Sequence, residues 1–265
     1  MRACGWALLQ LVYALYAAIS FLVLGLAALL ATLILPGVYR RRAAARALAR
    51  AFLLVAGMPL TVRGMERLAP GQCVVVANHA SYLDGLVFTA ALPARFSFVI
   101  KREMSAVPLA GLFLKRIGSE FVERFDRNRG AADARRVLRN AASGHSLVFF
   151  PEGTFTRSPG LLKFHTGAFV TAARAGCPVI PAVVRGTRTA LPPTGGLPRP
   201  GRIEIDILPA VQARPDASEA SSAALRDGAR TAILLALGEP DLTCSGDSAH
   251  PPHTAPERSA RASRS

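Results

Sequence analysis

Residues 73–84 read Cys-Val-Val-Val-Ala-Asn-His-Ala-Ser-Tyr-Leu-Asp, five apolar residues followed by a polar loop. The apolar run is rich in β-branched residues and predicts a buried strand over 73–77. The residues that follow, from Leu83 to Leu92, favour a helix. A strand that leads through a polar loop into a helix is typical of an α/β sheet, and α/β proteins bind ligands where such strands end.

The same alternation continues on both sides of this stretch. Further strands are expected at 96–100, 120–122, 147–150, 179–184 and 203–208. Helices are expected at 83–92, 109–117, 131–142, 166–175 and 218–237. The chain is therefore predicted to be an α/β protein with a mixed, mostly parallel sheet flanked by helices.

The N-terminal segment is apolar enough to enter a membrane. No charged residue lies between Trp6 and Pro36, and about 20 apolar residues suffice to cross a bilayer. A cleaved signal peptide and a buried soluble helix are less favoured, because the apolar run is too long for either. A tilted span and a bent hairpin in one leaflet both fit. Residues 1–59 are therefore expected to form a membrane-anchoring helical segment.

Basic residues follow the apolar segment without an acidic residue among them: Arg40, Arg41, Arg42, Arg46 and Arg50. Such residues favour the cytoplasmic side of a membrane and are expected to contact anionic lipid headgroups. The whole chain has 32 basic and 17 acidic residues, a net charge of +15. An anionic membrane surface explains this excess better than nucleic acid, because no nucleic-acid recognition motif is present.

The composition of the C-terminal residues indicates where the folded domain ends, and the spacing of the cysteines disfavours a metal site. From residue 239 to 265 the chain is rich in Ser, Pro, Gly, His and Arg and is expected to be a disordered tail, which leaves 60–238 as the folded domain. The four cysteines are scattered without the spacing of a zinc site. We expect neither a metal nor a cofactor.

His79 and Asp84 form the first candidate site. On one continuous helix the two side chains would point about 140° apart, so contact requires His79 in the loop and Asp84 in the first helical turn. A carboxylate in that place would fix the imidazole tautomer and raise its basicity. The alternative is a helix cap beside an incidental histidine.

A second polar cluster follows the strand at 147–150. Glu152, Gly153 and Thr154 supply a carboxylate, a backbone N–H and a hydroxyl within three positions, and Arg157 follows. An ordinary polar turn is the alternative interpretation. Two such clusters at strand ends, in a basic chain with an apolar N-terminus, favour a functional site.

Taken together, the sequence resembles the glycerolipid acyltransferase family of 1-acyl-glycerol-3-phosphate acyltransferases. Four family blocks match in order over about residues 60–190: Asn78-His79 followed by Asp84, Gly118 through Phe121-Val122-Glu123-Arg124, Phe150-Pro151-Glu152-Gly153-Thr154, and Val179-Ile180-Pro181-Ala182-Val183. Each block is weak alone, and the ordered set is specific. The domain 60–238 is thereby interpreted as an acyltransferase domain.

The resemblance implies an enzyme that transfers a fatty acyl group from acyl-CoA or acyl carrier protein to the free hydroxyl of lysophosphatidic acid. His79 would be the general base and Asp84 its partner. Substrate-binding residues implied by the resemblance are Asn78, Arg124, Glu152, Gly153, Thr154 and Arg157. Another lysolipid acceptor, such as a lyso-aminolipid, and a non-catalytic lipid-binding protein of the same fold remain alternatives. The implied location is the cytoplasmic face of a bacterial inner membrane.

Two positions depart from the family pattern. Where many members carry an arginine directly after Glu-Gly-Thr, this chain has Phe155, and Arg157 follows two positions later. This shift places the phosphate-binding role of Arg157 in question. His165 stands where a lysine is common, and we interpret that difference as a surface change.

Overall fold

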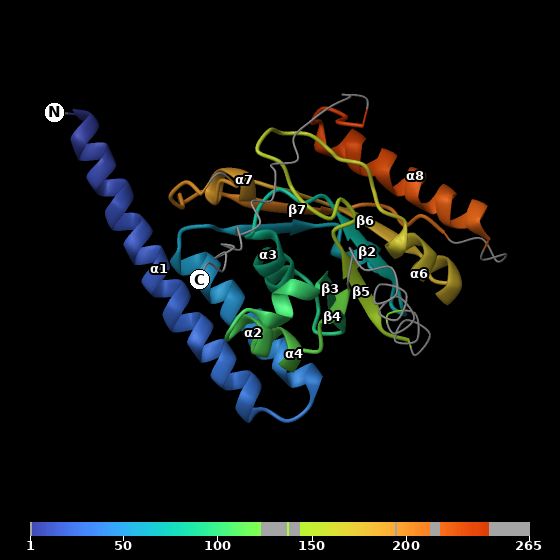
Figure 1. Cartoon of the computed structure of the whole chain (residues 1–265), viewed down its shortest axis with the longest axis horizontal. Helices are drawn as coiled ribbons and strands as arrows, with labels where there is room; N and C mark the ends of the chain where they lie inside the picture. Colours follow the sequence, from blue (N-terminus) through green and yellow to red (C-terminus); the bar gives the residue numbers. More distant parts are fainter. Residues whose placement is uncertain (1, 123–136, 138–143, 194, 213–217, 244–265) are drawn as a thin grey trace, which may run out of the picture.

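A computed structural model describes residues 2–122, 137, 144–193, 195–212 and 218–243. In this part of the chain seven strands form one sheet in the order β1-β7-β6-β2-β5-β3-β4 (Figure 1). The strands are β1 Leu60–Arg63, β2 Val74–Ala77, β3 Phe96–Lys101, β4 Glu120–Val122, β5 Ser146–Phe149, β6 Val179–Arg185 and β7 Ile203–Ile207. Only the β6–β7 pair is antiparallel among these strands, which confirms the predicted mixed, mostly parallel sheet.

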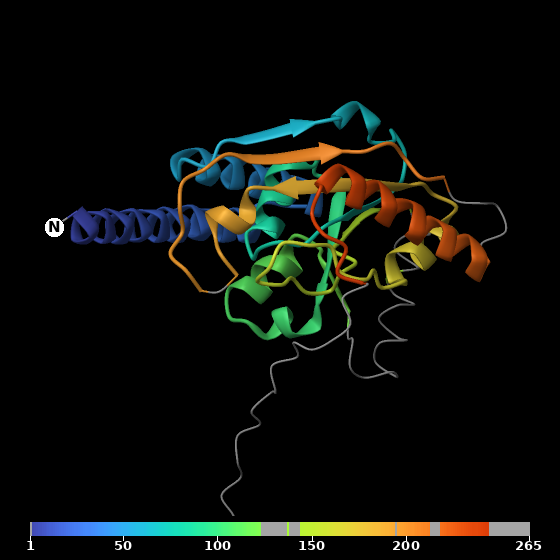
Figure 2. The same cartoon turned by 90° about the horizontal axis from the view of Figure 1, so that it is seen from above.

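Helices cover both faces of the sheet (Figure 2). They are α1 Arg2–Ile34, α2 Val38–Val55, α3 Asp84–Ala91, α4 Ala110–Arg116, α6 Gly167–Ala175, α7 Thr187–Ala190 and α8 Glu219–Leu237, with short 3₁₀ turns at Met65–Arg67 and Arg102–Ala106. Side chains of β2 alternate between the two faces, as a strand requires. Val75 packs with α2 and α3, whereas Val74 and Val76 pack with α6 and α8. The central strands are therefore buried on both sides.

Strand β1 is an element that the sequence analysis did not predict. Leu60 and Val62 pack against the core, while Thr61 and Arg63 are exposed. Four residues with only two apolar side chains give a weak strand pattern in the sequence. In the structure, β1 is held by its pairing with β7. The expected helix at 131–142 lies outside the described residues except for Val137, which is helical and buried.

The N-terminal segment forms two antiparallel helices. The chain turns after α1 and returns as α2, so that Phe21 meets Phe52 edge-to-face with ring centroids 5.5 Å apart. The Tyr13 hydroxyl donates a hydrogen bond to the Ala56 carbonyl over 2.7 Å. The N-terminal end of α1 projects beyond the sheet (Figure 2). The residues Gly5–Ile34 form a helix long and apolar enough to cross a membrane.

The arginines of α2 contact backbone carbonyls of the protein. Lipid headgroups are the partners that the sequence predicts, but the structure gives four of the five arginines backbone carbonyls. Arg42 donates to the carbonyls of Ile117 and Gly118 over 2.7 and 3.1 Å, just beyond the end of α4. Further contacts to carbonyls are Arg41 to Leu35 and Arg116, Arg42 to Arg95, Arg46 to Ala91 and Arg50 to Ala90.

These contacts have a simple physical cause. The last carbonyls of a helix lack partners within it, and a cation near a helix C-terminus is favourable. Arg46 and Arg50 lie beside the last turn of α3, and Arg42 lies beside the end of α4. The basic run therefore fastens α2 to the domain.

Residues just beyond α8, which the sequence places in the tail, contact the domain. Glu239, Asp241 and Thr243 lie beyond α8 and form hydrogen bonds with the domain or with one another. Leu161 and Asp241 form a parallel bridge. Ordered packing thus continues to residue 243, because the acidic side chains find arginine and backbone partners that composition does not reveal. Residues 244–265 lie outside the described part.

Candidate active site

The candidate site lies where neighbouring strands end. Strand β2 lies between β5 and β6, and the carboxyl ends of these parallel strands meet at one edge of the sheet. Asn78 follows β2 and is buried. Its amide donates to the Val184 carbonyl over 3.1 Å and accepts from the Val184 N–H over 2.8 Å. This side chain joins β2 to β6, which differs from the substrate contact implied by the resemblance.

His79 and Asp84 are in contact, in the arrangement that the sequence required. His79 lies in the loop after β2, and Asp84 is the first residue of α3. The imidazole Nδ1 lies 2.8 Å from Asp84 Oδ2. The same oxygen accepts the N–H groups of Ala80 and Ser81 over 2.6 and 2.9 Å. Asp84 is fully buried, so its carboxylate has a fixed orientation.

Aromatic rings surround the imidazole. Phe150 stacks on His79 with ring centroids 4.6 Å apart, and Phe155 meets it edge-on at the same distance. Tyr82 in turn meets Phe155 edge-on at 4.8 Å. About one fifth of the His79 side chain remains exposed. The ring is thus held on two sides and still open to a reactant.

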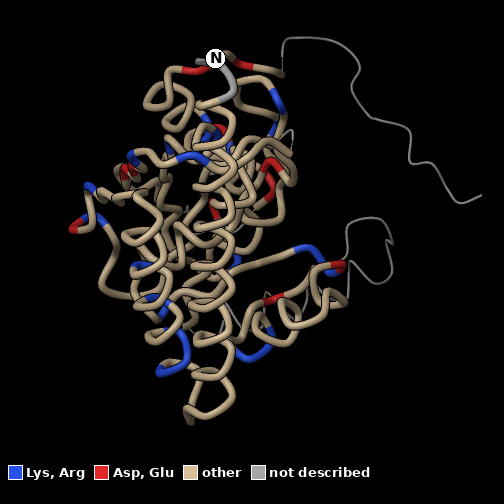
Figure 3. Tube along the Cα trace, turned by 90° about the vertical axis from the view of Figure 1, so that its left-hand side faces the viewer, with Lys and Arg blue, Asp and Glu red and all other residues tan. Residues whose placement is uncertain are grey.

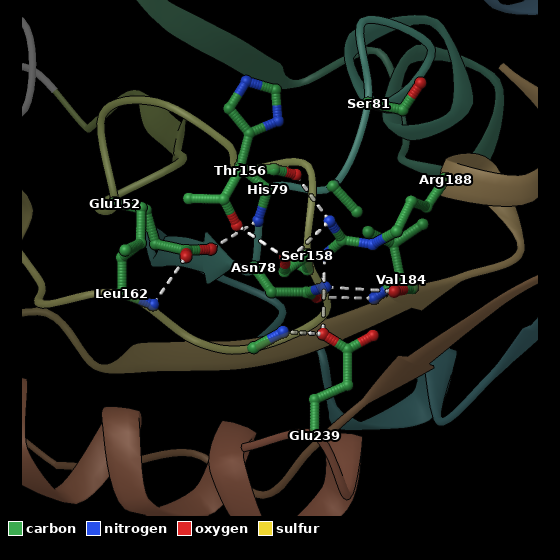
Figure 4. A network of polar contacts seen from close by, with 12 residues as sticks. Asn78, His79, Ser81, Glu152, Thr156, Ser158, Leu162, Val184, Arg188 and Glu239 are labelled. Carbon is green, nitrogen blue, oxygen red and sulfur yellow. Dashed lines mark hydrogen bonds and ion pairs between the residues drawn. The ribbon is translucent and has the colours of Figure 1, made fainter. Parts of the chain in front are cut away.

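Glu152 holds the backbone of the same loop. Its Oε1 accepts the His79 N–H over 2.6 Å, and its Oε2 accepts the Leu162 N–H over 2.8 Å (Figure 4). Burial raises the pKa of this carboxyl to about 7, although these two N–H groups and the nearby Arg188 act in the opposite direction. Each oxygen of the carboxylate thus accepts one backbone N–H of the protein.

The other residues expected to bind substrate do not share the surroundings of Asn78 and Glu152. The Gly153 N–H donates to the Phe150 carbonyl over 3.1 Å, so it closes a turn. Gly153 has φ 76°, a left-handed conformation that favours glycine. Thr154 and Arg157 are exposed in the segment that follows β5. Arg124 lies outside the described residues.

The sequence analysis missed Arg188. This residue follows β6, and its guanidinium donates to the carbonyls of Thr156 and Ser158 over 2.6 and 3.0 Å. It also lies 3.4 Å from the Glu239 carboxylate. Arg188 lies on α7, three residues after the end of β6, so the sequence signal is an arginine shortly after a third neighbouring strand end.

The geometry suits proton transfer from a hydroxyl. A histidine that donates Nδ1–H to a carboxylate leaves Nε2 as the proton acceptor. The Asp84 charge also stabilises the imidazolium that forms after the transfer. A general base of this kind would activate an alcohol as the nucleophile.

Comparisons with known proteins point to one family. Residues 59–185 match the family model described as Acyltransferase. A Caenorhabditis elegans protein named as a 1-acyl-sn-glycerol-3-phosphate acyltransferase is 31% identical over 193 residues, 70% of this chain and 67% of the relative. The lyso-ornithine lipid O-acyltransferase of Pseudomonas aeruginosa is 35% identical over 144 residues, 52% of this chain and 53% of the relative. This chain spans about half the length of several curated relatives or less.

A solved structure shows the same fold. The 1-acyl-sn-glycerophosphate acyltransferase PlsC of Thermotoga maritima superposes with a TM-score of 0.71 and 21% identity. The match covers 90% of this chain and 97% of that structure. The ordered motifs, the family-model match and the relatives agree. This chain belongs to the acyltransferase family that includes the 1-acyl-sn-glycerol-3-phosphate acyltransferases.

Proposed function

We propose that this chain transfers a fatty acyl group from acyl-CoA or acyl carrier protein to the free hydroxyl of lysophosphatidic acid, which yields phosphatidic acid. The observation that carries the proposal is the His79–Asp84 pair at the carboxyl end of β2. Its proton-accepting nitrogen is the group that acylation of an alcohol needs. The names of relatives such as the C. elegans protein supply the acceptor.

In this mechanism the acceptor alcohol is the nucleophile. His79 Nε2 takes the hydroxyl proton while the oxygen attacks the thioester carbonyl, and Asp84 stabilises the cationic ring. Collapse of the tetrahedral intermediate breaks the C–S bond and expels the thiolate, which takes the proton from the His79 imidazolium and so returns the histidine to its neutral form. Asn78 and Glu152 position the His79 loop through backbone contacts. We assign Arg124 and Arg157 to the acceptor phosphate, because a guanidinium binds phosphate oxygens through paired N–H groups.

The direct test is a comparison of two histidine variants. His79→Ala should lower the turnover of lysophosphatidic acid with labelled oleoyl-CoA about 100- to 10,000-fold, the usual contribution of a general base. His145→Ala is the matched control, because His145 precedes β5 at the opposite end of the sheet. Asp84→Asn should also be severely impaired. Near-normal turnover by folded His79→Ala would refute the mechanism.

A second acceptor class is favoured by one observation. The Pseudomonas relative is named for a lyso-ornithine lipid, which carries no phosphate, and it is 35% identical to this chain. Initial rates with lysophosphatidic acid and a lyso-ornithine lipid at equal concentration separate the two acceptors. If lysophosphatidic acid is the acceptor, Arg124→Lys keeps the positive charge but loses the forked geometry that binds phosphate. This variant should therefore raise the KM for lysophosphatidic acid and leave the KM for acyl-CoA unchanged. A preference for the lyso-ornithine lipid would overturn the phosphatidic acid assignment.

We also place the enzyme on a membrane, at the cytoplasmic face of a bacterial inner membrane. The support is the exposed apolar face of α1, which includes Leu8, Leu15, Leu22 and Ile34. In the tube view of Figure 3 the long N-terminal helix carries almost no charged residue along its length. Acceptor and product are both lipids, so an enzyme held at the bilayer meets them where they are dissolved.

A further inference from the structure

The segment directly after α8 contacts the loop that carries the second sequence cluster. We define residues 239–243 as the C-terminal clasp and residues 155–162 as the site loop. The Gly160 N–H donates to Glu239 Oε2 over 2.6 Å. The Leu161 N–H donates to the Pro240 carbonyl over 2.9 Å, and the Leu242 N–H donates to the Leu161 carbonyl over 3.1 Å. The clasp therefore pairs with the site loop like a short strand.

Two arginines each contact both the clasp and the site loop. Arg188 lies 3.4 Å from Glu239 and donates to the carbonyls of Thr156 and Ser158 (Figure 4). Arg230 forms a two-pronged ion pair with Asp241, with N···O distances of 2.5 and 2.9 Å. It also donates to the carbonyls of Leu161 and Leu162. Each arginine thus binds one clasp carboxylate and two site-loop carbonyls.

The close approach of the two segments is built into the sequence. Gly160 has φ 142°, a conformation that L side chains rarely adopt. A Cβ at this position would come within 2.5 Å of Leu242 Cγ. Hydrogen bonds from Arg230 and then Thr243 hold the pKa of Asp241 well below its ordinary value, so this partner stays charged at neutral pH. Glycine and charge together allow the clasp to lie against the loop.

The site loop in turn positions the catalytic histidine. Phe155 at its start meets the His79 ring edge-on at 4.6 Å. Leu162 at its end donates its N–H to Glu152, which accepts the His79 N–H. Both ends of the site loop therefore contact the His79 region, and the clasp holds the residues between them.

From these contacts we infer that Glu239 is a positioning residue for the acyltransferase reaction, acting through Arg188 and Gly160 on the site loop. This inference rests on the proposed function. Without the Glu239 charge, Arg188 would still bind the carbonyls of Thr156 and Ser158 and hold that part of the loop. The N–H of Gly160 would lose its charged acceptor, so the Gly160 end of the loop would be released. Loss of the Glu239 charge thus loosens the Gly160–Leu162 end of the site loop, and through the Leu162 N–H it disturbs Glu152 and the His79 backbone without touching a reacting atom.

The test compares Glu239→Gln with Glu204→Gln. Glu204 pairs with Arg63 at the same 3.4 Å distance on the β1–β7 edge, and 26% of its side chain is exposed against 27% for Glu239. We expect Glu239→Gln to lower kcat/KM for the lysolipid acceptor about tenfold, because small displacements in an active site have large effects on rate. The KM for acyl-CoA should stay within about twofold of wild type. Glu204→Gln should match wild type in both.

Hydrogen–deuterium exchange gives a readout that does not depend on activity. Peptides covering 155–162 should exchange faster in Glu239→Gln than in wild type, while the same peptides are unchanged in Glu204→Gln. Absence of acyl transfer by the wild-type protein would refute the proposed function, and the exchange arm would still test the clasp. Faster exchange with unchanged acceptor kcat/KM, or no difference between the two variants, would overturn the positioning role.

Discussion

At the residue scale, His79 is held by two carboxylates that act on different atoms. Asp84 contacts the ring Nδ1, and Glu152 contacts the backbone N–H of the same residue. Both carboxylates are buried. A histidine fixed at its ring and at its backbone loses little orientation entropy when a substrate arrives, which favours catalysis.

Because the pKa of Glu152 is raised, we expect the free energy of unfolding to depend on pH. A carboxyl whose pKa rises from 4.5 to about 7 on folding stabilises the protein fully below pH 4.5, and this contribution is lost as pH rises through 7. The effect corresponds to about 3 kcal/mol. Between pH 5.5 and 8.5, the free energy of unfolding should therefore fall more in wild type than in Glu152→Gln, which cannot ionise.

Chemical denaturation in detergent at the two pH values measures this difference. Glu204→Gln serves as the control, because Glu204 is partly exposed on the edge of the sheet and should follow the wild-type dependence. An identical pH dependence in wild type and Glu152→Gln would contradict a perturbed Glu152.

At the element scale, α2 is both a partner of α1 and a support for the ends of α3 and α4. Its apolar residues Phe52 and Leu53 are buried, and its arginines reach helix-terminal carbonyls. A run of arginines after an apolar segment predicts lipid contact when only the sequence is considered. The fold also brings backbone carbonyls at the ends of α3 and α4 within hydrogen-bond distance of these arginines.

The variant Arg42→Met tests this role. Methionine keeps much of the side-chain volume but loses the hydrogen bonds to Ile117 and Gly118, so the unfolding free energy should fall by about 2 kcal/mol. The exposed Arg40 is the matched control, and Arg40→Met should be near neutral. Unfolding in detergent and binding to anionic vesicles would be measured for both. Weaker vesicle binding by Arg42→Met with unchanged stability would restore the lipid role.

At the scale of the whole molecule, α1 presents a large apolar surface beside the α/β domain (Figure 1). Soluble monomers seldom expose a continuous apolar patch of this kind. The antiparallel α2 covers one side of α1, while residues such as Leu15 and Leu22 face outward. The exposed face is therefore the surface through which the chain would meet a membrane.

Placing a charge on that face tests membrane binding. Leu22 is 67% exposed, and Leu22→Asp combined with Leu15→Asp should shift the protein from the membrane to the soluble fraction, because each charge costs about 3 kcal/mol in hydrocarbon. Leu235→Asp is the control, since Leu235 on α8 is 79% exposed and lies far from α1 in sequence. Equal membrane fractions for the two variants would contradict binding through α1.

The layered fold and the contact between His79 and Asp84 could both be predicted from the sequence. The strands at 73–77 and 179–184 and the helices that follow β2 and precede β6 appear within one or two residues of their expected ends. Strand periodicity and apolar runs are local properties, so they can be read without tertiary contacts. The His79–Asp84 contact was predictable for the same reason, because both residues lie on one short strand–loop–helix unit.

The residues that support the His79–Asp84 pair could not be predicted in this way. Glu152 binds the N–H groups of His79 and Leu162, Arg42 binds the carbonyls of Ile117 and Gly118, and Glu239 binds the N–H of Gly160. Nearly every residue type supplies the same backbone N–H and C=O, so such partners leave no signature in the sequence. Their identity depends on which loops the closed sheet brings together, and for that reason only the folded chain reveals them.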